Sequence, residues 1–264
     1  MVSEYPEIVY KYRTWSNENH KRILLNNEVF LSPPNDFNDP FDCRIPTNYH
    51  LLEENEMEDY ITQLIKKHKP SLTTESEIDS EKEYLRLKFA NRDKLQKDNE
   101  VIEFEGFNER VGVLSLSARW DSILMWSHYS ENHKGFCIGF KEESLRQSGL
   151  FGKGGTVFYG DDFPKIKPNP NFDITMRDSF LKTHTKSLDW QYEEEYRIVT
   201  LSYPEPLNRV VNIPKNFIAE IILGIEISLI HRSEILNEAK MRSIPTFQAK
   251  KVPFKFKIDR ERLL

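Results

Sequence analysis

Hydrophobic residues alternate with polar ones, or form short runs, in many brief segments of the chain, and such segments predict β-strands. They lie at residues 7–12, 28–31, 111–117, 136–140, 156–159, 190–201, 210–213, 218–223 and 252–258. Apolar residues at helical spacing predict helices at about 17–26, 119–130, 172–188 and 231–242. Because the helices do not alternate regularly with the strands, the order favours an α+β fold with a mixed or antiparallel sheet.

The pattern between about residues 50 and 107 is different, since apolar residues there stand at helical spacing among many charges. The segment 69–74, Lys-Pro-Ser-Leu-Thr-Thr, separates two predicted helices. Residues 51–110 hold 16 acidic and 10 basic side chains, so they carry the excess negative charge of a chain whose net charge is −5. We therefore expect a single α+β domain over residues 1–264, with a helical insert at 51–110 that is dispensable for chemistry.

Composition narrows the class of protein. Hydrophobic residues make up 38% of the chain and charged residues 30%, as in soluble globular proteins, and no apolar run is long enough to span a membrane. The first residues do not have the pattern of a secretory signal. The two cysteines, Cys43 and Cys137, support neither a disulfide framework nor a zinc ribbon. We expect a cytoplasmic protein with no membrane partner.

The end of the chain has the opposite charge to the insert. Residues 240–264 contain eight Lys or Arg side chains against Asp259 and Glu261. Such a basic segment can attract phosphates or acidic partners. Lysines also protect an exposed edge strand from pairing with other chains, and the predicted strand 252–258 combines a proline with alternating lysines as edge strands do. Both interpretations stay open.

The segment 190–201, Trp-Gln-Tyr-Glu-Glu-Glu-Tyr-Arg-Ile-Val-Thr-Leu, carries the strongest candidate chemistry. As a strand it would present Glu193, Glu195 and Arg197 on one face, because side chains alternate along a strand. The two carboxylates would repel each other, and the arginine would supply the counter-charge. Partly buried acids beside an arginine are candidates for an active site. The alternative is a charged strand face in contact with solvent.

Other polar motifs lie in a loop and in a helix. The density of Pro, Asn and Asp in residues 32–42 predicts a rigid loop, and such loops often carry binding groups. In the predicted helix 119–130, His128 is either a hydrogen-bonded structural histidine or part of an active site. We expect the polar motifs, represented by Arg13, Asn38, His128 and Glu195, to converge on one cleft.

Four of these motifs together resemble a large bacterial and phage family of unknown function. They are Val-Tyr-Lys-Tyr-Arg at 9–13, Phe-Asn-Asp-Pro-Phe-Asp at 37–42, Leu-Met-Trp-Ser-His-Tyr at 124–129 followed by His-Lys-Gly at 133–135, and Trp-Gln-Tyr-Glu-Glu-Glu-Tyr-Arg at 190–197. The resemblance covers about residues 8–225 and implies no particular activity.

A looser resemblance connects the chain to NAD-dependent ADP-ribosyltransferases. In that superfamily an Arg or His on the first strand binds the nicotinamide ribose, a Ser-x-Ser strand follows, and a late Glu-x-Glu or Gln-x-Glu strand carries the catalytic glutamate. Here Ser115-Leu116-Ser117 and Glu193-Glu194-Glu195 occur in that order, after a first strand with Lys11 and Arg13. Which of the two basic residues would take the first role stays open.

The second resemblance implies an ADP-ribosyltransferase fold with NAD as substrate and a nucleic acid or a protein as acceptor, in the setting of a toxin or a phage-defence effector. Glu195 would stabilise the cationic transition state, Glu193 would orient or deprotonate the acceptor, and His128 would be a third catalytic candidate. The residues expected to bind NAD are Lys11, Tyr12, Arg13, Asn38, Asp39, Ser117, Trp126, Tyr129, Trp190 and Arg197.

Two other classes of function compete with this one. A metal-dependent hydrolase or nuclease would use His128, His133, Glu193 and Glu195 as ligands, although their spacing matches no familiar metal motif. A sensor or partner-binding module would use the same polar motifs as a buried structural network.

Overall fold

The computed structural model of the protein, which describes residues 5–169, 175–202 and 207–264, is built on one eight-stranded sheet. The strand order is β12-β11-β10-β4-β1-β3-β8-β5. Every neighbouring pair is antiparallel except β10 and β11, so the sheet is mixed and the α+β prediction is confirmed. The strands are β1 (Ile8–Arg13), β3 (Val111–Ser117), β4 (Phe136–Lys141), β5 (Lys153–Thr156), β8 (Glu195–Leu201), β10 (Ile218–Leu223), β11 (Thr246–Lys251) and β12 (Ile258–Arg262).

Two short ribbons accompany the main sheet. In the first, β2 (Glu28–Phe30) pairs antiparallel with β9 (Val210–Asn212), and in the second, β6 (Phe158–Gly160) pairs parallel with β7 (Thr185–Ser187). The short helical turns η1 (Pro34–Asp36), η2 (Tyr49–Leu51), η3 (Leu188–Glu193) and η4 (Lys215–Phe217) lie in the connections. The β6–β7 ribbon and η3 precede β8 and bring polar residues to the face of the sheet described below.

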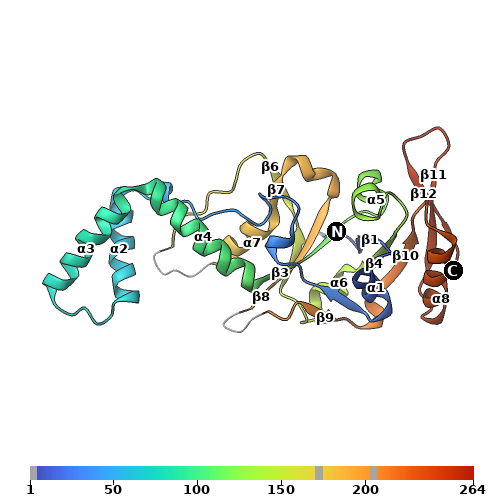
Figure 1. The fold of residues 1–264 in the computed structure, drawn as a ribbon, viewed down its shortest axis with the longest axis horizontal. Coiled ribbons are helices and arrows are strands. Elements are labelled where there is room, and N and C mark those ends of the chain that lie inside the picture. The colour runs from blue at the N-terminus through green and yellow to red at the C-terminus, as the bar shows by residue number, and fades with distance from the viewer. Residues whose placement is uncertain (1–4, 170–174, 203–206) are drawn as a thin grey trace.

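Helices cover both faces of the sheet (Figure 1). The largest apolar cluster packs α1 (Glu18–Leu25), α6 (Glu142–Gln147) and α8 (Leu229–Met241) against one face. On the opposite face, Met125 and Trp126 of α5 (Ile123–Tyr129) pack against Tyr12, Cys137 and Ile222. The helix α7 (Met176–His184) leads into β7. No helix in the described ranges is long and apolar enough to cross a membrane.

The sheet opens between β1 and β3. Strand β1 pairs with β4 over all six of its residues and β3 pairs with β8 over all seven, whereas β1 and β3 are joined at the pair Tyr10 and Ser117. Because the two strands share so little pairing, side chains along their inner edges are free to line a space between them. The sheet therefore consists of two well-paired halves, which are separated by a split between β1 and β3.

The helical insert is present but narrower than predicted. The helices α2 (Glu54–His68) and α3 (Glu75–Ala90) project away from the sheet and form a hydrophobic cluster of their own with the start of α4 (Arg92–Arg110) (Figure 1). The end of α4 belongs to the main body, because Phe107 packs against Val111, Val113 and Val199. The break at Asn91, which caps α4 through its side chain, was not predicted.

Two predicted strands are interrupted in the structure. The segment 190–201 is a strand only from Glu195, because residues 188–193 form η3 and Glu194 adopts a left-handed backbone with φ of 43°. Ser187 starts η3 by accepting a hydrogen bond from the backbone N–H of Asp189. The segment 156–159 is divided between β5 and β6, which belong to different sheets.

The predicted strand 252–258 is mostly the turn of a hairpin between β11 and β12, closed by a 2.9 Å hydrogen bond from Val252 N–H to the carbonyl of Lys257. Its alternating residues have the period of a strand, but the two phenylalanines are exposed and have no sheet to pack on. The predicted helix 172–188 is α7 at 176–184, and its last residues are β7. Residues 172–174 of that prediction lie outside the described ranges.

We predict that residues 54–90 can be replaced by a short Gly-Ser linker that joins Glu53 to Asn91. The two ends lie close together, because Arg92 donates hydrogen bonds to the carbonyls of Tyr49 and Leu52. The variant should unfold cooperatively in urea, with a loss of about 1.5–3 kcal/mol for each apolar side chain that becomes exposed.

The matched comparison is a deletion of residues 51–110. It also removes Phe107 and the ion pair between Glu103 and Lys182, so it should abolish cooperative unfolding. If the variant with the Gly-Ser linker is collapsed and does not unfold cooperatively, α2 and α3 are needed to complete the main core.

Candidate functional site

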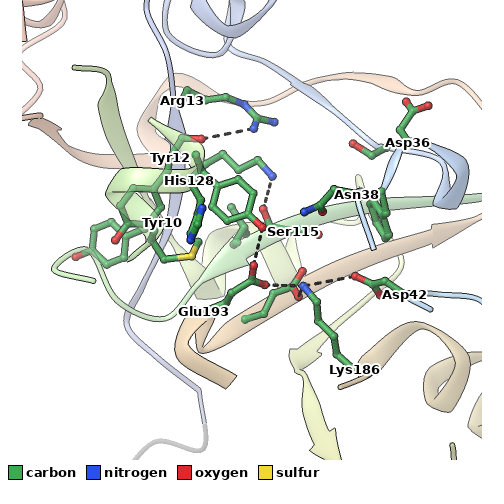
Figure 2. A pocket seen from close by; sticks show the side chains of 17 residues that line it. Tyr10, Tyr12, Arg13, Asp36, Asn38, Asp42, Ser115, His128, Lys186 and Glu193 are labelled. Atoms are coloured by element: carbon green, nitrogen blue, oxygen red, sulfur yellow. Dashed lines mark hydrogen bonds and ion pairs between the residues drawn. The ribbon is translucent and has the colours of Figure 1, made fainter. Parts of the chain in front are cut away.

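A cavity of about 420 Å³ lies in the split of the sheet. Its walls come from β1, β3, the loop 32–42, α5, β7, η3 and the start of β8 (Figure 2). The volume lies in the range of about 300–1,000 Å³ that is usual for small-molecule sites. The lining residues are Tyr10, Lys11, Tyr12, Arg13, Ser32, Asp36, Phe37, Asn38, Asp42, Ser115, Leu116, Met125, His128, Tyr129, Lys186, Glu193 and Glu195.

Arg197 fixes the carboxylates on one side of this cavity. The guanidinium is fully buried and donates to both oxygens of Glu195, each at 2.8 Å. It also donates to both oxygens of Asp42, at 2.8 and 2.6 Å, and to the carbonyl of Thr183 at 2.7 Å. Two bidentate pairs use the fork geometry that distinguishes arginine from lysine. Loop 32–42, α7 and β8 are therefore tied together at one buried group.

Lys186 joins the second glutamate to the same cluster. Its ammonium group donates to Glu193 at 2.6 Å and to Glu195 at 3.2 Å, and lies 3.5 Å from Asp42 (Figure 2). Glu193 also accepts a 2.6 Å hydrogen bond from the hydroxyl of Tyr129 on α5. Each carboxylate thus has charged or hydrogen-bonding partners, as buried charges require.

The pKa values of the two glutamates are shifted in opposite directions. Burial raises the pKa of Glu193, and the nearby charge of Glu195 adds to that effect against the opposing attraction of Lys186. Burial alone would also raise the pKa of Glu195, but Arg197 and then Lys186 hold it well below the usual range. Near neutral pH, Glu195 is a fixed anion, while Glu193 takes up a proton more readily than an ordinary glutamate.

Two basic side chains of β1 line the other part of the cavity. Lys11 donates a hydrogen bond to the carbonyl of Ser115 across the split, and burial together with the adjacent Arg13 lowers its pKa well below the usual range. Burial lowers the pKa of Arg13 to about 10. Within the ranges that the structure describes, Arg13 forms no ion pair with a carboxylate. Its charge is therefore available to an anionic group of a ligand.

The motif His-Lys-Gly at 133–135 explains how β1 is held beside α5. Gly135 packs so closely on β1 that a Cβ atom there would lie 2.1 Å from the carbonyl oxygen of Arg13. A glycine is required at this close approach. His133 does not reach the cavity and stacks on Trp126 instead, with 6.2 Å between the ring centroids.

Eight of the residues predicted for the site line the cavity: Lys11, Tyr12, Arg13, Asn38, His128, Tyr129, Glu193 and Glu195. Arg13, Asn38, His128 and Glu195 come from four different motifs, so the expected convergence on one cleft is confirmed. The other five predicted residues, Asp39, Ser117, Trp126, Trp190 and Arg197, lie outside the lining.

Those five have structural contacts that explain their distance from the cavity. Ser117 donates to the carbonyl of Glu193 at 2.7 Å, and the fully buried Trp126 donates its indole N–H to the carbonyl of Trp120 at 2.7 Å. Asp39 accepts a turn hydrogen bond from the N–H of Phe41. Trp190 covers Lys186, whose Nζ lies 4.8 Å from the ring centroid. These residues stabilise the site but do not line the cavity.

The sequence did not identify Lys186 and Asp42 as lining residues. Lys186 falls at the end of a segment predicted to be helical, where a lysine is usually solvated. Asp42 is separated from Arg197 by 155 positions in the chain, so no local pattern links the two. For Asp42 the one available signal is its place in the Phe-Asn-Asp-Pro-Phe-Asp motif.

The metal-dependent alternative required His128 and His133 beside the two glutamates. His128 lines the cavity but His133 lies outside it. Among the described residues no group of three or more His, Cys, Asp and Glu side chains is arranged to hold a metal ion. The lysine and arginine that surround Glu193 and Glu195 occupy the oxygens that such an ion would need.

Comparison with known proteins bears on the centre of the chain. Residues 125–198 are similar to a family described as a protein of unknown function, DUF2971. This segment contains most of α5, all of β4, β7 and η3, and the start of β8, and so includes His128, Lys186 and both glutamates. The resemblance to an uncharacterised domain family is thereby confirmed. No curated protein and no solved structure matches the chain.

We predict that Arg197→Met lowers the free energy of unfolding by about 3–5 kcal/mol, because it leaves Glu195 and Asp42 buried without their common counter-charge. Urea denaturation at neutral pH would measure the loss. The control is Arg86→Met, which removes an exposed pair with Glu58 and should cost less than about 1 kcal/mol. Equal losses in the two variants would mean that the buried cluster does not hold the site together.

Proposed function

We propose that the protein is an NAD-consuming enzyme of the ADP-ribosyltransferase type, which cleaves the bond between nicotinamide and ribose. The observation that carries this proposal is the Glu193–Glu195 pair on one side of a cavity in a split sheet, with Lys11 and Arg13 on another part of its wall. NAD has a cationic nicotinamide ribosyl group and an anionic pyrophosphate, so it needs opposite charges in one cavity.

The reaction assigns different roles to the two glutamates. As the C–N bond breaks, nicotinamide leaves with the bonding electrons and positive charge develops on the ribose. The ionised Glu195 stabilises that charge, since it is held in place before the reaction begins. The oxygen or nitrogen of the acceptor then forms a bond to the ribose carbon, and its proton passes to Glu193, whose raised pKa suits a general base.

Arg13 and the residues of α5 complete this proposal. The guanidinium of Arg13 faces the cavity without a carboxylate partner among the described residues, so it suits the pyrophosphate or a ribose hydroxyl. Tyr129 orients Glu193 through its 2.6 Å hydrogen bond. The divided sheet, with basic residues on the first strand and the Glu-x-Glu motif near a later one, supports an ADP-ribosyltransferase type of architecture.

We predict that Glu195→Gln lowers nicotinamide release by about 100- to 1,000-fold, because it removes the charge that stabilises the transition state. Glu193→Gln should slow transfer by a similar factor and retain NAD binding. The matched control is Glu194→Gln, which alters an exposed carboxylate paired with Arg119 at 2.9 Å and should leave turnover unchanged.

Purified variants would be incubated with NAD, and released nicotinamide would be measured by chromatography. Thermal unfolding of each variant would verify that it is folded, since Glu195→Gln also removes a partner of Arg197. The assignment fails if Glu194→Gln and Glu195→Gln reduce turnover equally, or if the folded wild type never releases nicotinamide.

We predict that the dependence of kcat/KM on pH reports the ionisation of Glu193. A general base acts when ionised, so kcat/KM should fall as the pH drops through the pKa of Glu193, which burial places above the usual 4.5. In Glu193→Gln the remaining slow reaction should lose this acid limb. An acid limb that is unchanged in Glu193→Gln would assign the proton transfer to another group.

A specific observation favours a second candidate, a module that binds a nucleotide without turning it over. All four carboxylate oxygens of Glu193 and Glu195 already have partners, as in a structural network. Calorimetric titration with NAD distinguishes the two functions, because binding without nicotinamide release supports the module and release with turnover supports the enzyme.

A further inference from the structure

We infer that the hairpin between β11 and β12 is a binding element for single-stranded nucleic acid. The hairpin tip, residues 252–257 with the sequence Val-Pro-Phe-Lys-Phe-Lys, projects beyond the rest of the sheet (Figure 1). A role for this nucleic acid as the acceptor of ADP-ribose rests on the proposed function. The binding of nucleic acid to the hairpin does not depend on the proposed function.

The two aromatic rings of the hairpin tip contribute nothing to the core. Phe254 and Phe256 have relative exposures of 107% and 102%, which are the largest among the exposed hydrophobic side chains of the described residues. A solvent-exposed pair of phenylalanines is unfavourable unless a partner covers it. Neither ring has a ring or cation contact within the described ranges, so both faces are open to a flat ligand.

The backbone supports the same conclusion. Phe254 has φ of 59°, a left-handed conformation that glycine or asparagine would adopt with less strain. The turn is closed by hydrogen bonds from Val252 N–H to Lys257 O and from Lys255 N–H to Val252 O, at 2.9 and 3.2 Å. Strained backbone positions cluster at binding and active sites, so a large aromatic residue in this conformation supports a functional role for the turn.

The charges around the rings favour nucleic acid as the partner. Lys255 and Lys257 alternate with the phenylalanines and have no ion pair among the described residues, whereas Lys250 and Lys251 are paired with Glu261 and Glu226. Proteins bind single strands through such a combination, in which bases stack on aromatic rings and phosphates contact basic groups. A membrane is less suitable, because Phe254 and Phe256 are the only exposed large hydrophobic residues of the hairpin tip, which the structure describes in full, and membrane binding strength scales with the apolar area that is buried.

The base of the hairpin is close to the wall of the catalytic cavity. Ala249 and Ile258 pack in one cluster with Met125 and Trp126 of α5, and Met125 lines the cavity. Arg260 on β12 is paired with Glu220, and its guanidinium lies 4.8 Å from the ring of Trp120 and 4.3 Å from that of Phe247, so the aromatic surface continues along β12 although this charge is compensated. A strand bound along this surface would be led past α5 toward the cavity.

The test is fluorescence anisotropy with labelled oligo-dT and oligo-U of about 12 nucleotides. Wild-type protein should bind both, and a duplex of the same length more weakly, since paired bases cannot stack on the rings. Phe254→Ala and Phe256→Ala should each weaken binding about fivefold or more. Lys255→Gln with Lys257→Gln should reduce the slope of log K against log salt by about 1.4, at about 0.7 for each phosphate contact.

Matched controls come from exposed residues elsewhere. Leu229→Ala with Ile230→Ala removes an exposed apolar pair on α8, and Lys94→Gln with Lys97→Gln removes two exposed charges on α4. Both should bind the oligonucleotides as the wild type does. Nicotinamide release by the hairpin variants in the absence of oligonucleotide should also be unchanged, so a loss of binding is separable from a failure of the proposed chemistry.

Other outcomes overturn the inference. These are an absence of oligonucleotide binding at low salt, or hairpin variants that bind as tightly as the wild type. Binding to vesicles of phosphatidylcholine and phosphatidylserine that needs Phe254 and Phe256, without oligonucleotide binding, would assign the hairpin to a membrane surface. A dimer seen by light scattering that dissociates in Phe256→Ala, again without oligonucleotide binding, would assign it to a second copy of the chain.

Discussion

The buried guanidinium of Arg197 is the group on which the site depends. Taking a charge out of water costs several kcal/mol, and that cost is offset only when partners satisfy the charge fully. Here Glu195 and Asp42 each meet the fork with two oxygens, and the carbonyl of Thr183 accepts a further hydrogen bond. The loop 32–42 is consequently held to the sheet by charge as well as by apolar contacts, so the same group both shapes the cavity and compensates its carboxylates.

This arrangement explains why two neighbouring glutamates behave differently. Both share Lys186, but only Glu195 also meets Arg197, so the pKa of Glu195 is lowered while burial raises that of Glu193. Pairs of titratable groups whose surroundings separate their pKa values are typical of acid–base chemistry. The separation arises from the fold, because Glu195 lies on β8 beside Arg197 while Glu193 ends η3 beneath Tyr129.

The sequence was sufficient for features with a local cause. Strand periodicity located β1, β3, β4 and β10, and it placed Glu195 and Arg197 on one face. Glu193 joins them for another reason, since the left-handed backbone at Glu194 turns the chain before β8 begins. Lys186 and Asp42 were not predicted because charge compensation acts between distant parts of the chain. The segment 252–258 was wrongly predicted to be a strand. The alternation of apolar and polar residues indicates the period of a strand, but it does not indicate whether Phe254 and Phe256 are buried.

For the binding of a polyanion, the distribution of charge over the molecule matters more than the net charge. A net charge of −5 opposes a polyanionic partner at long range, yet the excess of acidic over basic side chains lies in residues 51–110, and α2 and α3 lie at the opposite end of the molecule from β11 and β12 (Figure 1). At physiological ionic strength charges are screened over about 8 Å, so a ligand near Lys255 experiences mainly the local basic surface. The remote acidic helices then disfavour non-productive contact at their own end, and attraction is restricted to the end of the sheet beside α5.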